Sequence, residues 1–595
     1  MSGRRTVVTV VAAAVWAAIA LPVVPSYAAN PVTDLYVGAS GSDSNNDCAT
    51  IESPCATVQY AVDQADASGT TIHVGAGTFD GPIRPGALGM SLNIDGVSPA
   101  DTILTNSGLD GFVVEADTAT TGLSNLTARG GLASTVLVDG GGLAADHVFL
   151  ETAGCVLGVL AGSATVTDST LQGGGYGGAS CDVAATSDPM VGDVAISDGS
   201  VRLVRTQVLR PDQGRPGVKV KGGTFTADRS YFDDAANDLD TNNSDGLRVS
   251  GGTASVRRSA FHGFGSSGVH TLGGTALLTD DTFDGNVVGA TNGTGSLTAV
   301  RSTFQAAELA SLQGDISLAG SVLETDSIGN CANGTVTDLG YNLATDDTCG
   351  LTAATSHEGV AGLNLDTGIA DRGGPVPTVA ILNPSAAVDT IPVGASYGDP
   401  ATPLCPVTDA TDLRGVPRPA GGACDAGSME MAATATVVDG PAKAAPHAAT
   451  TFDAEVGVPA STDVDGLGLP VGTVTFTSGG QDLCLAVPVS SSGEAQCTTS
   501  ALGVGVRSVV ATFTPGSGST LHAGTSAPVT TNVGTVPVIT APGRFVLHVG
   551  TKVSIVLRAS GLPTPVVRLR KGHLPRGLRF HRGTGRATIT GTPKR

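Results

Sequence analysis

The stretch GGTASVRRSAF (residues 251–261) recurs farther along the chain as GGTALLTDDTF (273–283) and GTGSLTAVRSTF (293–304). Each copy opens with glycine and a small hydroxyl residue, alternates apolar with polar positions, and closes on a phenylalanine. Looser copies precede them: GGTFTADRSYF (222–232), GSVRLVRTQV (199–208), GSATVTDSTL (162–171) and GLAADHVFL (142–150). The middle of the chain is therefore built from a repeated unit of sequence.

The closing apolar residues measure the length of this unit, because most neighbours in the series are 19 to 24 residues apart. They are Leu126, Phe149, Leu171, Val208, Phe232, Phe261, Phe283, Phe304 and Leu323. Such a period, with apolar–polar alternation and no helix in each unit, predicts a β-solenoid whose coils pair through short strands. Equivalent inward residues then stack about 4.8 Å apart, so we expect Phe261, Phe283 and Phe304 to form one interior column.

Two details refine this prediction. The LxxLxL frame and the asparagine of leucine-rich repeats are absent, which excludes the other common fold of similar period. The gaps from Leu171 to Val208 and from Phe232 to Phe261 are longer and predict loops that leave otherwise regular coils. Asp280 and Asp281 lie at a turn of the repeat, and we interpret them as residues that end a strand ladder rather than as a catalytic pair.

The start of the repeat region carries a family resemblance. LYVGASGSDSNNDCATIESPCATVQYAVDQADASGTTIHVGAGTF (35–79) resembles the N-terminal cap of bacterial right-handed parallel β-helices of the pectin-lyase-like superfamily. Within it, an amphipathic pattern predicts a short helix whose apolar face covers the open end of the stack. The residues of that face are Val58, Ala61, Val62 and Ala65.

The end of the repeat region carries a second resemblance. DLGYNLATDDTCG (338–350), DRGGPVPTVAILNPSAAVDT (371–390) and TDLRGVPRPAGGACDAGSMEM (411–431) are similar, in this order, to the choice-of-anchor Q domain of exported bacterial β-helix proteins. That family is defined by layout, so the resemblance implies architecture and no activity.

Two further segments resemble immunoglobulin-like domains. GTVTFTSGG (472–480), GEAQCTTSALGVGVRSVVATFTPGSG (493–518) and TSAPVTTNV (525–533) look like a bacterial Ig-like domain, with the strand spacing of a sandwich. ASGLPTP (559–565) and LPRGLRFHRGTGRATITGTP (574–593) resemble a cadherin-like Ig domain. That family continues with more strands after its GTP motif, so we expect the last domain to be incomplete.

The expected fold is all-β: a right-handed parallel β-helix with an N-terminal cap helix, followed by Ig-like β-sandwich domains. We place a signal peptide at 1–28 and the β-helix with its cap at 29–324. The choice-of-anchor-Q-like C-terminal part of the β-helix follows at 325–431, the bacterial Ig-like domain at 432–535, and the basic cadherin-like domain at 536–595.

The N-terminal 28 residues predict export. Arg4 and Arg5 precede an apolar run from Val7 to Leu21, and small residues at Ser26 and Ala28 suit a cleavage site. No later segment is apolar for long enough to span a bilayer. We therefore expect a secreted or cell-surface-associated protein whose mature chain has no membrane span.

Ten cysteines in an exported chain predict disulfides. They form five pairs of near neighbours in the sequence, with no CxxC motif and no histidine beside any pair, which argues against metal ligation. The predicted pairs are Cys48 with Cys55, Cys155 with Cys181, Cys331 with Cys349, Cys405 with Cys424, and Cys484 with Cys497.

One set of polar residues could carry chemistry. Aligning GVKVKGG (217–223), GLRVSGG (246–252) and GVHTLGG (268–274) places Lys219, Arg248 and His270 in one outward column on adjacent coils. A polysaccharide lyase needs a cation to neutralise a uronate carboxylate and a base to remove the α-proton. The alternative is an ordinary solvated surface whose cations balance nearby aspartates.

The acidic stretch DDAANDLDTNNSDG (233–246) leads into the middle coil of that column. Alternate spacing would let four oxygen-bearing side chains converge on one Ca²⁺ ion, although the spacing departs from the EF-hand. These candidate calcium ligands are Asp238, Asp240, Asn242 and Asp245. A solvated turn between two strands is the alternative.

Charge is distributed unevenly along the chain. Without Arg4 and Arg5 the chain has 30 basic and 53 acidic residues, a formal charge of −23, yet Pro537–Arg595 contains twelve Lys or Arg and no Asp or Glu. The part before it therefore carries −35. This asymmetry predicts that the basic end binds an anionic cell-envelope polymer; the alternative is a composition-biased tail on a truncated, poorly folded domain. No nucleic-acid partner is expected.

Two functions fit the sequence. The first is a non-catalytic exported surface protein that binds carbohydrate or another surface ligand, with its Ig-like domains as stalk or anchor. The second is a lyase or hydrolase that acts on acidic polysaccharide through Lys219, Arg248 and His270. The motifs of galacturonases and pectate lyases are missing, since NSDG (243–246) has no GHG partner, and this favours the first function.

Overall fold

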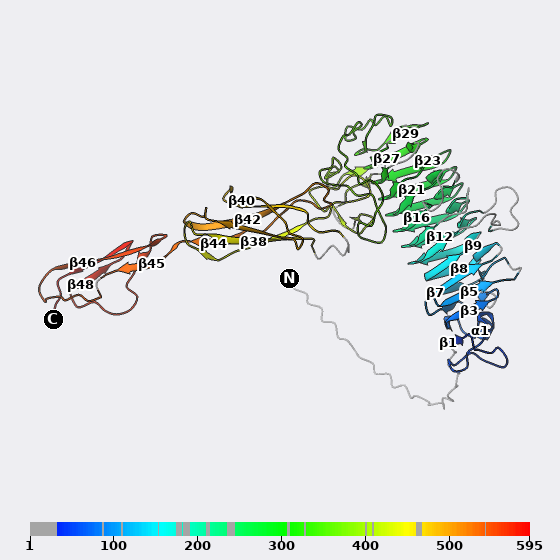
Figure 1. Cartoon of the computed structure of the whole chain (residues 1–595), viewed down its shortest axis with the longest axis horizontal. Helices are drawn as coiled ribbons and strands as arrows, with labels where there is room; N and C mark the ends of the chain where they lie inside the picture. Colours follow the sequence, from blue (N-terminus) through cyan, green and yellow to red (C-terminus); the bar gives the residue numbers. More distant parts are fainter. Residues whose placement is uncertain are drawn as a thin grey trace, which may run out of the picture.

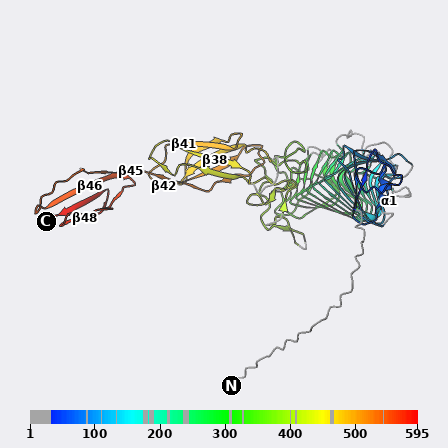
Figure 2. The same ribbon diagram turned by 90° about the horizontal axis from the view of Figure 1, so that it is seen from below.

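The chain forms a row of all-β parts (Figure 1). The computed structural model describes residues 33–595 except 86–88, 109–110, 132, 153, 174–180, 182–190, 210–214, 235–243, 306–309, 326–328, 399–400, 407–409, 460–466 and 542. The predicted signal peptide lies outside the described residues. A stack of coils leads into an irregular segment, an Ig-like domain and a small β module at the C-terminal end (Figures 1 and 2).

Three parallel sheets run along the stack, and successive coils pair strand by strand within each sheet. Sheet 1 contains β6 (Val114–Ala116), β8 (Ser134–Glu151), β9 (Cys155–Thr167), β11 (Val194–Ile196), β14 (Val218–Val220), β17 (Leu247–Val249), β20 (Ser267–Thr271), β23 (Val288–Asn292), β26 (Ala310–Gln313) and β29 (Cys331–Ala332). Sheet 2 contains β1 (Asp34–Val37), β2 (Thr70–Val74), β4 (Leu92–Asp95), β7 (Thr120–Gly130), β8, β9, β12 (Ser200–Val204), β15 (Thr224–Asp228), β18 (Thr253–Arg257), β21 (Thr275–Thr279), β24 (Ser296–Val300), β27 (Ile316–Ala319) and β30 (Val336–Asp338). Sheet 3 contains β3 (Gly77–Asp80), β5 (Thr102–Asn106), β7, β8, β10 (Thr170–Gln172), β13 (Gln207–Leu209), β16 (Tyr231–Asp233), β19 (Ala260–His262), β22 (Thr282–Asp284), β25 (Thr303–Gln305), β28 (Val322–Leu323) and β31 (Leu343–Ala344). The predicted parallel β-helix is confirmed.

The interior of sheet 3 holds the predicted phenylalanine column. The rings of Phe232, Phe261, Phe283 and Phe304 stack in succession, with centroids 4.5, 5.0 and 4.6 Å apart and planes within 8° of parallel. All four side chains are fully buried. The closing residues Leu171, Val208 and Phe232 of the looser repeats pair in the predicted register. The two earliest closing residues are misplaced, because Leu126 pairs with Val148, and Leu150, not Phe149, pairs with Leu171. Phe149 therefore points outward and is only half-buried.

The corner between sheets 2 and 3 contains a buried column of hydroxyl groups. In successive coils the backbone N–H of one coil donates to the side chain of the next: Ser230 to Ser259 at 3.1 Å, Ser259 to Asp281 at 2.8 Å, and Asp281 to Ser302 at 3.4 Å. Asp281 takes a serine position in this column and is fully buried, and burial raises its pKa well above the ordinary value. Asp280 and Asp281 lie at the turn between β21 (Thr275–Thr279) and β22 (Thr282–Asp284), as the repeat predicts.

The N-terminal end of the stack is covered by α1 (Val58–Gln64) (Figure 1). Thr57 caps this helix, since its hydroxyl accepts a hydrogen bond from the Tyr60 N–H. The face predicted from the sequence is buried, with Ala61 and Val62 fully inaccessible to solvent. The cap thereby shields the first strands from edge pairing.

The coil ladder continues into the predicted C-terminal part of the β-helix, since β28 pairs with β31. From residue 358 to 431 the chain forms no strand that joins the ladder in its described residues, and instead packs on the outside of sheet 3 (the lateral segment). Ser428 hydrogen-bonds Thr282 at 2.7 Å and Thr303 at 3.0 Å. Its short strands pair with each other: β32 (Ser396–Tyr397) with β33 (Thr402–Pro403), and β34 (Ala410–Thr411) with β35 (Pro417–Arg418).

The Ig-like domain is a two-sheet sandwich. One sheet contains β36 (Ala435–Asp439), β38 (Thr450–Gly457) and β41 (Glu494–Thr499); the other contains β37 (Lys443–Ala444), β44 (Val529–Val533), β42 (Gly505–Pro515), β39 (Gly472–Ser478), β40 (Gln481–Pro488) and β43 (Gly524–Thr525). Phe452, Phe476 and Phe513 are fully buried between the sheets. This closed core is the one that the sequence predicts.

The C-terminal module (residues 535–595) is much more open. Its main sheet has the order β45 (Thr535–Thr540), β46 (Val553–Leu562), β50 (Arg586–Gly591) and β48 (Leu578–His581), and β47 (Val566–Val567) pairs with β49 (Gly583–Thr584). Among its described apolar side chains, only Val567, Ala587 and Pro593 are buried, and all six residues of β45 are exposed.

All five predicted disulfides are present, and no cysteine is free. The Cys484–Cys497 bond joins β40 to β41 and thereby connects the two sheets of the Ig-like domain. In the part of the chain that the structure describes, no helix has both the length and the apolar character needed to cross a membrane.

Candidate functional site

The predicted column of cations exists in sheet 1. Lys219 of β14 is the register partner of Arg248 in β17, which is in turn the partner of His270 in β20. Their neighbours Val218, Leu247 and Val269 are fully buried, so the alternation between core and surface follows the prediction.

The column differs from the prediction in its exposure. Lys219 is only 5% exposed, whereas Arg248 and His270 are half-buried. The register partner of Lys219 on the preceding coil is Ala195, which packs fully buried under the Cys155–Cys181 disulfide. The outer face of sheet 1 is therefore covered on this side, and Lys219 is not an open surface cation.

Asp245 connects two members of this column. Its Oδ2 atom lies 2.6 Å from the Arg248 Nε and 3.3 Å from the His270 Nδ1, and its Oδ1 accepts from the Ser267 N–H at 3.2 Å. Asp245 is fully buried, which opposes ionisation, but the bond from His270 and the charge of Arg248 outweigh burial and lower its pKa. The carboxylate is thus an internal counter-ion for both residues.

The structure describes only one of the four predicted calcium ligands. Asp238, Asp240 and Asn242 lie outside the described residues, and Asp245 has both carboxylate oxygens in the contacts above. The calcium site stays a prediction for these four residues.

A second column, which the sequence analysis missed, follows the corner between sheets 2 and 3. One residue in each coil adopts a left-handed backbone there, with φ between 45° and 59° from Arg205 to Arg301. In chain order these turn residues are Arg205, Arg229, Arg258, Asp280 and Arg301. The signal was visible in the repeat as RT, RS, RS, DD and RS before each closing apolar residue.

Most of these turn arginines are neutralised within the coils. Arg205 pairs with Asp168 at 2.5 Å, Arg258 with Asp228 at 2.7 Å, and the buried Arg301 with Asp280 at 2.7 Å. Arg229 differs, because its buried Nε has no hydrogen-bond partner among the described residues. Burial and the charge of Arg258 lower the pKa of Arg229.

A third polar cluster lies on the outside of sheet 3. The His262 Nδ1 lies 3.0 Å from an Asp233 oxygen and 3.3 Å from the Tyr231 hydroxyl, and its Nε2 lies 3.7 Å from Asp284. The hydrogen bond that His262 donates to Asp233 raises the pKa of His262, and burial raises that of Asp284. The Ile369 N–H of the lateral segment donates to Asp284 at 3.0 Å, so the segment covers part of this cluster.

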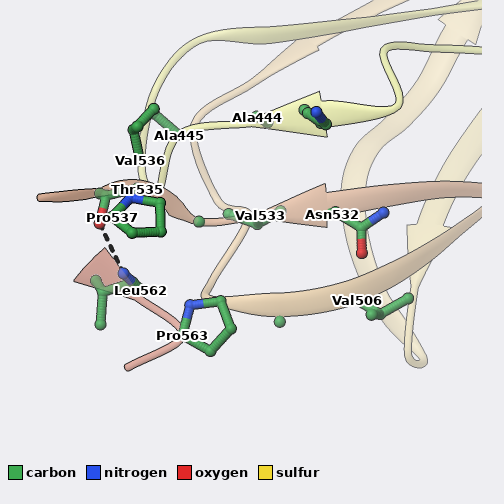
Figure 3. Close-up of a pocket in the computed structure, with 13 residues that line it drawn as sticks. Ala444, Ala445, Val506, Asn532, Val533, Thr535, Val536, Pro537, Leu562 and Pro563 are labelled. Atoms are coloured by element: carbon green, nitrogen blue, oxygen red, sulfur yellow. Dashed lines mark hydrogen bonds between the residues drawn. The ribbon is translucent and has the colours of Figure 1, made fainter. Parts of the chain in front are cut away.

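A large cavity lies away from all these clusters, between the Ig-like domain and the C-terminal module (Figure 3). Its volume is about 810 Å³, and it is lined mainly by apolar and backbone atoms around Val506, Val533, Val536 and Leu562. A hydrogen bond of 2.7 Å from the Leu562 N–H to Thr535 spans its edge. The lining offers one cation, Lys443, and no titratable pair that could act as acid and base.

The C-terminal module presents the largest group of uncompensated charges. All twelve of its Lys and Arg residues are exposed, and the module contains no carboxylate side chain that could pair with them. The ion pairs among the described residues all lie in the coils, the lateral segment or the start of the junction to the Ig-like domain, the last being His522 with Asp389.

Comparison with known proteins identifies one domain. Residues 436–534 match the family model of the bacterial Ig-like domain (group 3). No curated protein matches the chain. The family model covers the predicted Ig-like domain, whereas the choice-of-anchor Q and cadherin-like resemblances stay predictions.

Solved structures with a similar course of the chain include two pectin methylesterases. That of carrot has a TM-score of 0.31 and 14% identity and covers 44% of this chain and 85% of its own; PemA of Erwinia chrysanthemi has 0.30 and 10%, with 42% and 89% covered. ORF18 of Geobacillus virus E2 has a TM-score of 0.27 and 9% identity over 80% of this chain and 74% of its own. At these TM-scores the likeness carries no argument about activity or ligand.

Proposed function

We propose that this is an exported, surface-associated binding protein whose C-terminal module attaches to an anionic envelope polymer. The observation that carries the proposal is the set of twelve exposed cations on a module without a single acidic residue. Such a surface attracts polyanions through many weak, salt-sensitive contacts. The Ig-like domain then joins this anchor to the β-helix, which presents its outer faces to carbohydrate or other surface ligands.

The setting supports this proposal. Five disulfides fit an oxidising environment outside the cytoplasm, and the N-terminal sequence has the pattern of a signal peptide. The β-helix itself is acidic, so repulsion from an anionic polymer would keep the coils away from the surface that the module contacts.

The Lys219 column makes most of its polar contacts within the coils. The His270 Nδ1 and the Arg248 Nε are both directed at Asp245, so of the His270 ring nitrogens only Nε2 would be left to accept a proton from a substrate. Lys219 is buried. These residues therefore support the local fold in the present arrangement.

A second candidate function, cleavage of acidic glycans, rests on the alignment of Lys219, Arg248 and His270 in one register column. Release of unsaturated or reducing ends from uronate polymers, lost in His270→Gln, would support this enzyme. If the unaltered chain and His270→Gln give the same rate as buffer, the column has no catalytic role on those polymers.

The anchor is tested on the full mature chain with matched charge removals. One variant carries Arg568→Gln, Arg570→Gln and Lys571→Gln in the C-terminal module. The control carries Arg129→Gln, Arg202→Gln and Arg257→Gln, three exposed cations of the β-helix. Both variants lose three positive charges, so they differ only in where the charge was.

Retention on immobilised polygalacturonate and on purified cell walls is measured from about 0.05 M to about 0.5 M salt. We expect the unaltered chain and the control to elute at similar salt and the module variant to elute at clearly lower salt. Equal elution of all three proteins would overturn the proposal and place the attachment site elsewhere.

A further inference from the structure

The lateral segment and the Ig-like domain meet at a fixed junction. The Asn383 N–H donates to the Ser519 carbonyl at 2.8 Å, and the Gly518 N–H donates back to the Asn383 carbonyl at 2.9 Å. Beside this pair, the His522 N–H donates to the Ala432 carbonyl at 2.9 Å. The backbone therefore holds His522, a residue of the Ig-like domain, against the lateral segment.

Two carboxylates of the lateral segment face this histidine. Asp389, Asp425 and His522 each offer one ligand atom, and these three atoms lie within 4.8 Å of one another. The Asp389 Oδ2 is 4.0 Å from the His522 Nδ1, which is too long for a hydrogen bond. The three side chains surround a common point without bonding each other's side chains directly.

One nitrogen of the His522 side chain is left without a hydrogen bond in the described part of the chain. The residue is only 9% exposed, and its Nε2 is buried without a hydrogen-bond partner among the described residues. An unsatisfied buried nitrogen is unfavourable, so native structures rarely keep one without a water or an ion. This nitrogen and the Asp389 Oδ1 both lie within 3.0 Å of the position that a Cβ atom of Gly421 would take, so a group bound on that side would meet the histidine and this carboxylate together.

The carboxylates are held in place by backbone donors. Asp425 is fully buried, and its two oxygens accept from the Asp389 N–H and the Met431 N–H, both at 2.7 Å. Asp389 accepts from the Ala423 N–H at 2.8 Å through Oδ1. In metal sites, hydrogen bonds of this kind to the metal-binding side chains hold those side chains in orientation.

Gly421 lies beside Asp389 and His522 and leaves space next to them. A Cβ atom at this position would lie 2.6 Å from the Asp389 Oδ1 and 3.0 Å from the His522 Nε2. Any larger residue would therefore push against both groups. The glycine leaves room beside the two groups.

We propose that Asp389, Asp425 and His522 bind a divalent metal ion of the zinc type, which joins the lateral segment to the Ig-like domain. One imidazole nitrogen and two carboxylate oxygens suit Zn²⁺, with water as the fourth ligand, whereas Ca²⁺ prefers oxygen ligands alone. Zinc–ligand distances of about 2.0 to 2.2 Å require the ligand atoms to draw together. Asp389, whose side chain is 41% exposed, is the one with freedom to do so.

The only comparable cluster in the described chain lacks these features. Asp146, His147 and Asp168 also bring three ligand atoms together, but Asp146 and His147 are exposed. The His147 Nδ1 already bonds Asp146 at 2.9 Å, and Arg205 neutralises Asp168. This cluster supplies a matched control, because it has the same residue types without the buried free nitrogen.

Zinc binding is tested on the full mature chain after treatment with a chelator. Zn²⁺ alone is titrated by calorimetry, and Co²⁺ is titrated by visible absorption, which reports the ligands directly. Asp389→Asn and His522→Gln remove proposed ligands, Gly421→Ala fills the space beside them, and His147→Gln is the control. Thermal unfolding with and without Zn²⁺ reports the coupling of the ion to the junction.

We expect one equivalent of Zn²⁺, a higher Tm with the ion, and binding at least about tenfold weaker in Asp389→Asn and His522→Gln. His147→Gln should bind like the unaltered chain. If His522→Gln does not fold, the exposed Asp389→Asn decides the question. No binding by the unaltered chain at micromolar zinc, or equal binding by Asp389→Asn and the control, would overturn the site.

Discussion

The coils of the β-helix and the C-terminal module use their charged residues in opposite ways. In the coils, Arg258 and Arg301 bond carboxylates of neighbouring coils at 2.7 Å. In the module, twelve cations are exposed and no acidic residue is present. Charge in the coils is therefore part of the internal structure, whereas charge in the module is available to a partner.

The two regions also differ in how far their apolar side chains are buried. The coils bury a continuous core that includes four stacked phenylalanines. The module leaves Val536, Val546 and Val549 at least 60% exposed. Stability is expected to come mainly from the coils and binding mainly from the module, and substitutions can test this division.

The largest effect should follow from opening a cavity in the phenylalanine column. Phe283→Ala removes a fully buried ring stacked on both sides and should lower the free energy of unfolding by about 3 to 5 kcal/mol. Phe545→Ala removes the same ring from the module, where it is 39% exposed, and should cost less than about 1 kcal/mol. Guanidinium unfolding measures both; equal losses would contradict the division of roles.

The phenylalanine column also shows what the sequence could predict. The clearest coils share one repeated sequence pattern. Alignment of the repeats therefore predicts which residues pair in neighbouring coils, as for Phe261 with Phe283 and for Lys219 with Arg248. Where the repeat weakens, the alignment failed by one residue, at Phe149. A single-residue slip reverses which side chains face the core.

Other features had no repeat to reveal them. The lateral segment has no period, so its packing on sheet 3 through Ser428 was not predictable from the sequence. The burial of Lys219 depends on what covers sheet 1, and the cluster of Asp389, Asp425 and His522 joins residues more than 90 positions apart. Local pattern carries no information about such contacts between distant segments.

A smaller effect should follow from cutting the Ig-like domain's disulfide. Replacing Cys484 and Cys497 by serine removes the bond between its two sheets, and a closed loop of this size contributes about 2 to 4 kcal/mol. The C-terminal module has no cysteine. Hydrogen exchange should accelerate in β39 and β42 and stay unchanged in β46 and β50; equal acceleration in both would show that the two domains unfold as one unit.

A still smaller effect concerns pH. The hydrogen bond that His262 donates to Asp233 raises the pKa of His262, so the folded coils bind this proton more tightly than the unfolded chain does. The stabilisation is fully present below about pH 6.5 and is lost as the pH rises through the folded pKa. His262→Gln should therefore reduce the loss of stability between pH 6 and pH 9.

The control for this pH effect is His548→Gln in the C-terminal module, where the histidine is exposed. Tm values at both pH values for the three proteins measure the difference. A slope unchanged in His262→Gln, or changed equally in both variants, would show that the Asp233 contact does not stabilise the charged imidazole.

The smallest effects on stability are expected for two single arginine substitutions, one in the coils and one in the module, which should differ in their effect on binding. Arg257 has a side chain that is 50% exposed and reaches Asp228 only at 3.4 Å, while Arg258 holds the same carboxylate at 2.7 Å. Arg257→Ala should therefore change the free energy of unfolding by less than about 0.5 kcal/mol. Arg579→Ala, at an exposed position of the module, should be equally neutral for stability. Only Arg579→Ala should lower retention on polygalacturonate, because its charge has no internal partner; a matching loss in Arg257→Ala would mean that the coils also contact the polymer.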